Sequence, residues 1–116
     1  MAIVDDEANV VATYELLFKR RKIPISFTAL DGCEALEKFK NADPKPTIII
    51  IDYRIPSMDG MELMKAVLAV ESHTKIIIIS GDDSIKQDVL EAGAHVFLKK
   101  PVSIKNIMEN VNSLLN

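Results

Sequence analysis

The chain has 116 residues, of which 48% are hydrophobic and 27% are charged, and its net charge at pH 7 is −3. This length suits one globular domain with its own core, and the composition excludes a disordered or fibrous chain. The negative charge argues against a nucleic-acid-binding surface, and the apolar runs are too short to span a membrane.

The first predicted unit is a short strand, Ala2–Val4, followed by a helix from about Glu7 to Arg21. Apolar residues recur at helical spacing there, with Tyr14 and Phe18 on the expected inner face. The basic run Lys19–Lys22 falls at the end of this helix, where cations interact favourably with the helix dipole. We therefore interpret the run as a helix terminus rather than as an interaction site.

The second predicted unit consists of a strand, Ile25–Ala29, and a helix over Gly32–Lys40. Apolar and polar residues alternate in the strand, which is typical of a strand near the edge of a sheet. The helix contains Cys33, and this single cysteine excludes a disulfide framework and a cysteine-based zinc site. We expect Cys33 to be a small, partly buried helix residue and the protein to act in the reducing cytoplasm.

The third and fourth predicted strands, Thr47–Ile51 and Lys75–Ile79, are almost continuous isoleucine. Such runs are typical of central parallel strands that are covered on both faces. Helices over Gly60–Val70 and Ser84–Ala92 follow them, and Gly93 is expected to close the second of these helices.

The fifth predicted strand, Val96–Lys99, precedes a helix whose apolar residues form one stripe after an N-cap at Ser103. Five successive strand–helix units predict an α/β fold, a doubly wound (βα)5 parallel sheet with helices on both faces. Residues 1–116 are expected to form one domain.

Polar side chains follow four of the predicted strands, at the sheet edge where such folds bind ligands. They are Asp5 and Asp6 after the first strand, Asp52 after the third, Ser80 after the fourth, and Lys99 and Lys100 after the fifth. Neighbouring carboxylates repel one another unless a cation compensates, and Mg²⁺ with oxygen ligands suits such a set. One of the first two acids could instead cap a helix, but capping does not account for a third acid, a hydroxyl and a lysine at matching strand ends. His95 begins the fifth strand outside this set, and we interpret it as a structural or surface residue.

A carboxylate in this setting can act as a nucleophile toward phosphorus without a base, because it is already ionised at neutral pH. Mg²⁺, a lysine and a hydroxyl can neutralise and orient the phosphoryl oxygens. The sequence therefore predicts phosphoryl transfer to Asp52.

Five motifs carry a family resemblance: Ile3-Val4-Asp5-Asp6-Glu7, the run from Ile51 to Gly60, Ile79-Ser80-Gly81, Glu91-Ala92-Gly93-Ala94 and Leu98-Lys99-Lys100-Pro101. In this order and strand context, the chain resembles the receiver domain of two-component response regulators over essentially its whole length. The resemblance implies the strand order 2-1-3-4-5 of flavodoxin-like folds.

By this resemblance, Asp52 is the phosphoacceptor, and Asp5 and Asp6 hold Mg²⁺ (or Mn²⁺) together with Asp52 and the backbone carbonyl of Arg54. Ser80 is the hydroxyl that bonds a phosphoryl oxygen. Lys100 is the lysine that pairs with the phosphoryl group, and a cis peptide bond is expected between it and Pro101. Lys99 is expected to point the other way.

The resemblance also implies that Ser80 and Phe97 form a switch. When phosphorylation draws the hydroxyl inward, the aromatic ring can fill the vacated space and alter the surface of the fourth helix, fifth strand and fifth helix. Phenylalanine lacks the hydroxyl of the tyrosine common in the family, so switching would act through packing alone. Arg54 and Asp82 flank the site and are expected to tune the lifetime of the phosphate.

The implied partners are a histidine kinase or a histidine phosphotransfer protein as donor, and a downstream protein or an excised output domain as reader. Phosphorylation-dependent homodimerisation is compatible with this role. We expect no direct nucleic-acid or membrane binding by this domain and no turnover enzyme activity beyond its own phosphorylation and dephosphorylation.

Three alternatives have distinguishing features. A haloacid-dehalogenase-type phosphatase requires an aspartate two residues after the nucleophile, where Arg54 stands. A flavodoxin-like cofactor carrier requires a phosphate loop rich in Ser, Thr and Gly after the first strand, where Asp5-Asp6-Glu7 would repel phosphate. A degenerate receiver would lack part of the acid, hydroxyl and lysine set.

Overall fold

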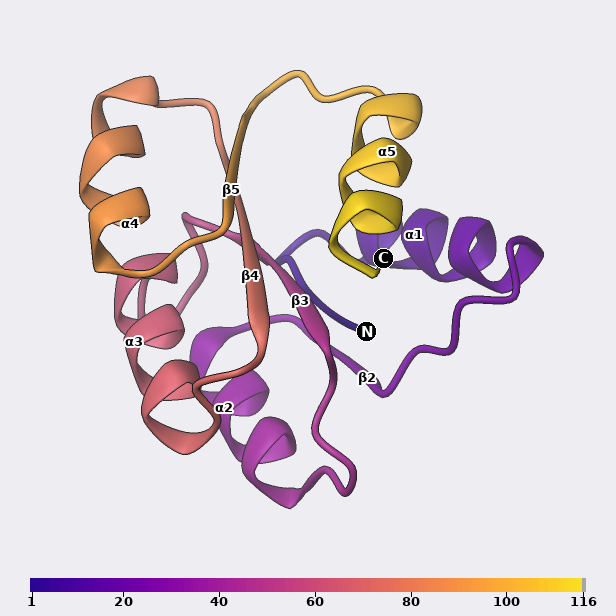
Figure 1. The fold of residues 1–116 in the computed structure, drawn as a ribbon, viewed down its shortest axis with the longest axis horizontal. Helices are drawn as coiled ribbons and strands as arrows, with labels where there is room; N and C mark the ends of the chain where they lie inside the picture. Colours follow the sequence, from indigo (N-terminus) through magenta and orange to yellow (C-terminus); the bar gives the residue numbers. More distant parts are fainter. Residues whose placement is uncertain (116) are drawn as a thin grey trace.

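The computed structural model describes residues 1–115, which form a five-stranded parallel sheet flanked by helices (Figure 1). In chain order the elements are β1 (Ala2–Val4), α1 (Ala8–Arg20), β2 (Phe27–Ala29), α2 (Gly32–Asn41), β3 (Ile48–Asp52), α3 (Gly60–Val70), β4 (Lys75–Ser80), the 3₁₀ turn η1 (Asp83–Ile85), α4 (Lys86–Ala92), β5 (Val96–Lys99) and α5 (Ile104–Leu115). The predicted (βα)5 fold is confirmed.

The strand order is β2-β1-β3-β4-β5, as the family resemblance implied. β3 lies at the centre, where Val4 of β1 pairs with Ile51 and Ile79 of β4 pairs with Asp52. Since the strands are parallel, this register brings the residues after β1, β3, β4 and β5 to one edge of the sheet.

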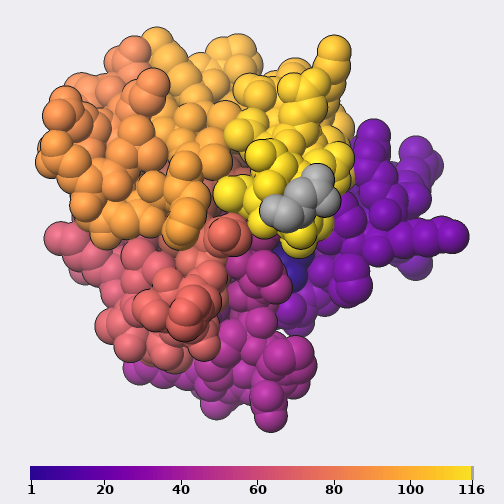
Figure 2. All heavy atoms as spheres, in the orientation of Figure 1, coloured from indigo at the N-terminus to yellow at the C-terminus, as the bar shows by residue number. Residues whose placement is uncertain are grey.

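Alternating isoleucines divide the core between the two faces of the sheet. Ile49 and Ile51 pack on the side covered by α2, α3 and α4, whereas Ile48 and Ile50 pack on the side covered by α1 and α5. Figure 1 shows these two helical layers on opposite sides of the strands, and Figure 2 shows that they leave little of the sheet visible from the same side. β3 is buried along its whole length, which explains its near-continuous run of isoleucine.

Two helix ends follow the sequence prediction closely. Gly93 closes α4 with a φ of 127°, a conformation that disfavours other residues. The Ser103 hydroxyl accepts a hydrogen bond from the Asn106 amide at 3.0 Å, and α5 begins at the next residue, Ile104.

Several local expectations were wrong. β2 begins at Phe27 rather than Ile25, because Ile25 turns toward the α1 side while Phe27 packs on the opposite side. A 3₁₀ turn precedes α4, since the Asp82 carboxylate accepts from the Ser84 amide and tightens the first turn. Cys33 is exposed, because its neighbours Gly32 and Ala35 occupy the inward stripe of α2.

Within residues 1–115, no helix has the length and apolar character that crossing a membrane requires.

Candidate functional site

The carboxyl edge of the sheet holds two buried aspartates. Asp52 ends β3 and is 6% exposed, and Asp5 directly follows β1 and is 7% exposed. The Asp5 amide donates to the Ala29 carbonyl at 3.1 Å, so the chain is still tied to β2 as it leaves the sheet. Two acids on adjacent strands are thus largely removed from water, which is unfavourable for carboxylates unless positive charge or hydrogen bonds compensate.

Lys100 supplies positive charge to Asp52. Its ammonium nitrogen lies 2.9 Å from Oδ2 of Asp52. Burial alone would lower the pKa of Lys100, but the hydrogen bond and the charge of Asp52 outweigh it, and the pKa is raised above its ordinary value. The peptide bond between Lys100 and Pro101 is cis, as expected.

Asp5 lacks an equivalent cation. Its Oδ1 accepts a hydrogen bond from the Glu7 amide at 2.9 Å, which favours the ionised form. Burial and the negative charge of Asp52 act in the opposite direction and raise the pKa of Asp5 to about 6. The same two acids contribute to a raised pKa of Tyr14, whose main cause is burial. This corner of the site therefore favours an added cation.

The residues that could hold such a cation are oxygen donors. Carboxylate oxygens of Asp5, Asp6 and Glu7 all lie within 4.8 Å of one another. Asp52 lies outside this cluster among the described residues, although the resemblance placed it in the ligand set; its carboxylate is bonded to Lys100 instead. The donors are hard oxygens, the type that Mg²⁺ prefers, and Asp5 is a buried carboxylate beside the negative charge of Asp52, so the residues fit this metal.

Glu7 does not cap α1 through its side chain, and neither Asp5 nor Asp6 does so. The helix begins at Ala8 with Glu7 as N-cap and no side-chain hydrogen bond. Helix capping therefore does not explain the adjacent acids.

Arg54 occupies the first part of the loop after β3. The Tyr53 amide before it donates to the Ile79 carbonyl at 2.9 Å, which ties this turn to β4. No hydrogen bond within residues 1–115 uses the Arg54 carbonyl oxygen, so it is free to accept a ligand. The Arg54 side chain points elsewhere, with its guanidinium 3.9 Å from Oδ2 of Asp82 and 79% exposed.

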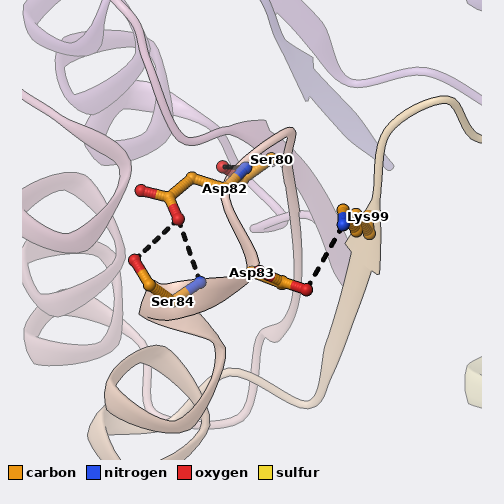
Figure 3. Close-up of polar contacts among 5 residues, drawn as sticks. All are labelled: Ser80, Asp82, Asp83, Ser84 and Lys99. Atoms are coloured by element: carbon orange, nitrogen blue, oxygen red, sulfur yellow. Dashed lines mark hydrogen bonds and ion pairs between the residues drawn. The ribbon is translucent and has the colours of Figure 1, made fainter.

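Ser80 ends β4 and is 2% exposed. Its hydroxyl oxygen accepts from the Asp82 amide at 3.0 Å. In the same loop, the Asp82 carboxylate accepts from both the amide and the hydroxyl of Ser84 (Figure 3). These two bonds lower the pKa of Asp82. The hydroxyl is thus buried, held by the loop that starts α4.

Lys99 pairs with Asp83, whereas Lys100 pairs with Asp52. The Lys99 ammonium lies 3.3 Å from Oδ2 of Asp83, a contact that Figure 3 shows bridging β5 and the loop after β4. Phe97, two residues earlier on β5, is half-buried against the core on the α4 side and pairs with Ile78. Nothing lies within 4 Å of the point where a Cβ on Gly81 would stand, so the mouth of the site beside Ser80 is open.

Sequence reasoning missed three contributors. Glu7 joins the acidic cluster, Tyr14 of α1 lies close enough to Asp5 and Asp52 to be affected by their charges, and Asp83 pairs with Lys99. Glu7 could have been found from its position beside the acid pair. The other two depend on how α1 and the loop before α4 pack, which no local pattern encodes.

The structure thus places Asp52, Lys100 and Ser80 at one edge of the sheet. Beside them lies the acidic cluster of Asp5, Asp6 and Glu7, which could bind a cation. A buried carboxylate with an adjacent ammonium and oxygen donors for Mg²⁺ is equipped to accept a phosphoryl group.

Comparison with known proteins identifies the family to which the chain belongs. The family profile of the response regulator receiver domain matches residues 1–112, and the chain belongs to this family. It is 28% identical to the chemotaxis protein CheY of Treponema pallidum over 115 residues, covering 97% of this chain and 80% of that protein. It is 33% identical to the transcriptional regulatory protein PrrA of Mycobacterium leprae, covering 97% of this chain but only 48% of PrrA.

Among solved structures, a chain of the CheX–CheY–BeF3–Mg²⁺ complex from Borrelia burgdorferi aligns with a TM-score of 0.91 at 31% identity. The alignment covers 99% of this chain and 87% of that chain. The protein therefore has the receiver fold of two-component response regulators.

Proposed function

We propose that this protein is a phosphorylation-dependent switch of a two-component system, acting in the cytoplasm. Asp52 accepts a phosphoryl group from a histidine kinase or a histidine phosphotransfer protein. The observation that carries the proposal is the buried Asp52 carboxylate with the Lys100 ammonium 2.9 Å away. The Mg²⁺ in the complex of the CheY relative supports a metal-assisted reaction here.

In the proposed transfer, an oxygen of Asp52 attacks phosphorus while the bond from phosphorus to the donor nitrogen breaks, and the electron pair leaves with that nitrogen. Lys100 pairs with the charge on the transferred group. The Ser80 hydroxyl can donate a hydrogen bond to a phosphoryl oxygen, because in its bond with the Asp82 amide the hydroxyl oxygen acts only as an acceptor. Asp5, Asp6 and the Arg54 carbonyl would hold Mg²⁺, joined by Asp52 through the carboxylate oxygen that Lys100 does not engage, and the metal would supply positive charge to the phosphoryl oxygens.

The proposed output is a change in the surface formed by α4, β5 and α5. Ser80 is linked through the Asp82 amide to the loop that starts α4, and Asp83 in that loop is paired with Lys99 of β5. Movement of Ser80 toward Asp52 would therefore shift both the start of α4 and β5. Phe97, which lies two residues before Lys99 on β5, would repack in response. A downstream protein, an output domain or a second copy of the chain would read the changed surface.

The experiment is incubation with Mg²⁺ and a small phosphodonor such as phosphoramidate, followed by intact-mass spectrometry. We expect one phosphoryl adduct that is stable in acid and labile in base, is absent without Mg²⁺, and is lost in Asp52→Asn. No adduct on the wild-type protein, or an equal adduct on the variant, would overturn the proposal. Sustained hydrolysis of a phosphate ester would instead favour a phosphatase.

A further inference from the structure

The loop between β3 and α3 carries the Arg54 carbonyl that we propose as a metal ligand. Its base is closed, because the Gly60 amide donates to the Tyr53 carbonyl at 2.7 Å. A Cβ on Gly60 would lie 2.8 Å from the Tyr53 Cα, so the two ends of the loop approach as closely as backbone allows. The position of Arg54 then depends on what holds the rest of the loop.

The far side of the loop is held by Ser57. The Ser57 hydroxyl oxygen accepts from the Cys33 amide at 2.9 Å and donates to Oδ1 of Asp31 at 3.2 Å. A third bond runs beside these two, from the Gly32 amide to the Pro56 carbonyl at 3.1 Å. The loop is thus attached to the start of α2, through hydrogen bonds between residues 24 and 26 positions apart in the sequence.

The anchor on α2 is itself well ordered by hydrogen bonds. Oδ1 of Asp31 also accepts from the Glu34 amide at 2.8 Å, and the Glu34 carboxylate accepts from the Leu30 amide at 2.7 Å. The Asp31 side chain thus caps α2, and the Glu34 carboxylate holds the residue before the N-cap, so two hydrogen bonds fix the start of the helix. Ser57 therefore connects the loop to a part of the fold that has little freedom to shift.

Ser57 also has a φ of 71°, in the left-handed region that a serine rarely adopts. Its hydroxyl is exposed and could bond to water instead, so the need to satisfy a buried polar group does not account for these contacts. Asparagine and glycine adopt this φ more readily. The hydroxyl contacts with Cys33 and Asp31 offset the unfavourable backbone conformation.

We propose that Ser57 is a positioning residue for Mg²⁺ binding: its bridge to Asp31 and Cys33 holds the β3–α3 loop so that the Arg54 carbonyl faces the metal. This inference rests on the proposed metal site. It has a reciprocal consequence, because a contact that strengthens Mg²⁺ binding must itself be strengthened by Mg²⁺ to the same degree. Metal binding at the sheet edge should therefore stabilise the first turn of α2.

Three substitutions distinguish the effect of the Ser57 hydroxyl from that of its left-handed backbone conformation. Ser57→Ala removes the hydroxyl but retains the unfavourable conformation. Ser57→Gly removes the hydroxyl and makes that conformation favourable. Ser57→Asn tolerates the left-handed conformation and restores an acceptor for the Cys33 amide. Ser103→Ala is the matched control, because it also deletes a serine hydroxyl that bonds the first turn of a helix, but on α5.

The first measurement is the Mg²⁺ dissociation constant of each protein by titration calorimetry with MgCl2. We expect it to rise about five-fold in Ser57→Ala and Ser57→Gly, which corresponds to one net hydrogen bond. Ser57→Asn and Ser103→Ala should bind as the wild type does. Equal Mg²⁺ affinity in all five proteins would overturn the inference, and so would a loss in Ser57→Ala that Ser57→Gly repairs, since the backbone alone would then be responsible.

The second measurement is hydrogen exchange of the Cys33 amide with and without Mg²⁺. In the wild type, saturating Mg²⁺ should slow this exchange by about the same five-fold factor. In Ser57→Ala the exchange should be fast and independent of Mg²⁺. Exchange at Cys33 that ignores Mg²⁺ in the wild type would contradict the inference. If the wild type binds no Mg²⁺ at all, the proposed function fails instead, which is a separate result.

Discussion

The ammonium nitrogen of Lys100 lies 2.9 Å from Oδ2 of Asp52, and the two side chains differ in exposure, at 44% and 7% respectively. The lysine can be solvated without its partner, whereas the aspartate depends on the lysine for compensation. The pair is therefore unequal, and removing one partner differs from removing the other. Lys99 provides a direct comparison, since it is also paired with an aspartate but both side chains are exposed.

Lys100→Met should lower the free energy of unfolding by about 1–2 kcal/mol at pH 7 without Mg²⁺, because it leaves the Asp52 charge buried and unpaired. This loss is smaller than for a fully buried ion pair, because the Lys100 side chain is 44% exposed. Lys99→Met should cost less than about 0.5 kcal/mol, as is typical of exposed ion pairs. Urea unfolding of both variants measures the difference. Equal losses would contradict a special dependence of Asp52 on Lys100.

Asp5 should make the metal-free protein less stable as pH rises from about 4 to 6. The folded pKa of about 6 exceeds the ordinary value of 3.8, so the folded state retains a proton that the unfolded chain has released. The stabilisation that the Asp5 proton provides is complete below the unfolded pKa of 3.8 and is lost as pH rises through the folded pKa of about 6. The loss is at most about 3 kcal/mol, at about 1.4 kcal/mol per pKa unit.

Asp5→Asn should remove this pH dependence and make the metal-free protein more stable at pH 7. Mg²⁺ should stabilise the wild type at pH 7 and leave Asp5→Asn unaffected. Thermal unfolding between pH 4 and 7, with and without MgCl2, measures both effects. A variant that is less stable than the wild type at pH 7 without metal would show that Asp5 is not a source of repulsion.

The convergence of Asp5, Asp52, Ser80 and Lys100 was predictable because it follows from topology alone. In a parallel sheet every strand ends at the same edge, so residues after the strands meet without knowledge of side-chain packing. The two-sided burial of β3 was equally accessible from its isoleucine run.

Features that depend on helix phase or on distant packing were not predictable in the same way. Cys33 was expected to be partly buried, but the inward stripe of α2 runs through Gly32, Ala35 and Phe39, and Cys33 lies one residue out of phase. Ser57 contacts residues 24 and 26 positions away, and nothing in its local sequence indicates them.

The Arg54–Asp82 ion pair should affect the rate of phosphorylation more than stability. Its atoms are 3.9 Å apart and the side chains are 79% and 41% exposed, so Arg54→Ala should change unfolding by less than about 0.5 kcal/mol. Asp82→Asn removes a negative charge near the mouth and frees the guanidinium to attract an anionic phosphodonor. The rate with acetyl phosphate should rise about two- to three-fold in low salt, and the gain should vanish near 1 M salt as charges are screened.

Asp82→Ala is the informative companion, since it also loses the Ser84 contacts. If the charge is responsible, Asp82→Ala and Asp82→Asn should accelerate phosphorylation alike. A rate increase that persists at high salt would instead point to a loosened loop before α4.

His95 should oppose Asp5 in the pH dependence of stability. Its Nδ1 accepts from the Ile76 amide at 3.1 Å, and a protonated ring cannot accept. Partial desolvation of the imidazole ring, followed by the charge of Lys75, lowers the pKa of His95 in the folded protein. The contribution of this histidine to stability is therefore present above the unfolded pKa of 6.5 and is lost as pH falls. The loss should not exceed about 1 kcal/mol, the net value of one hydrogen bond.

Between pH 7 and 5 the two groups therefore act in opposite directions, and single variants should separate them. His95→Asn retains an acceptor for the Ile76 amide but does not titrate, so its stability without Mg²⁺ should rise more steeply than that of the wild type as pH falls. Asp5→Asn should show the reverse, a decline toward pH 5. Thermal unfolding at half-unit pH steps measures the three profiles, and parallel curves for His95→Asn and the wild type would exclude any role of His95 in this range.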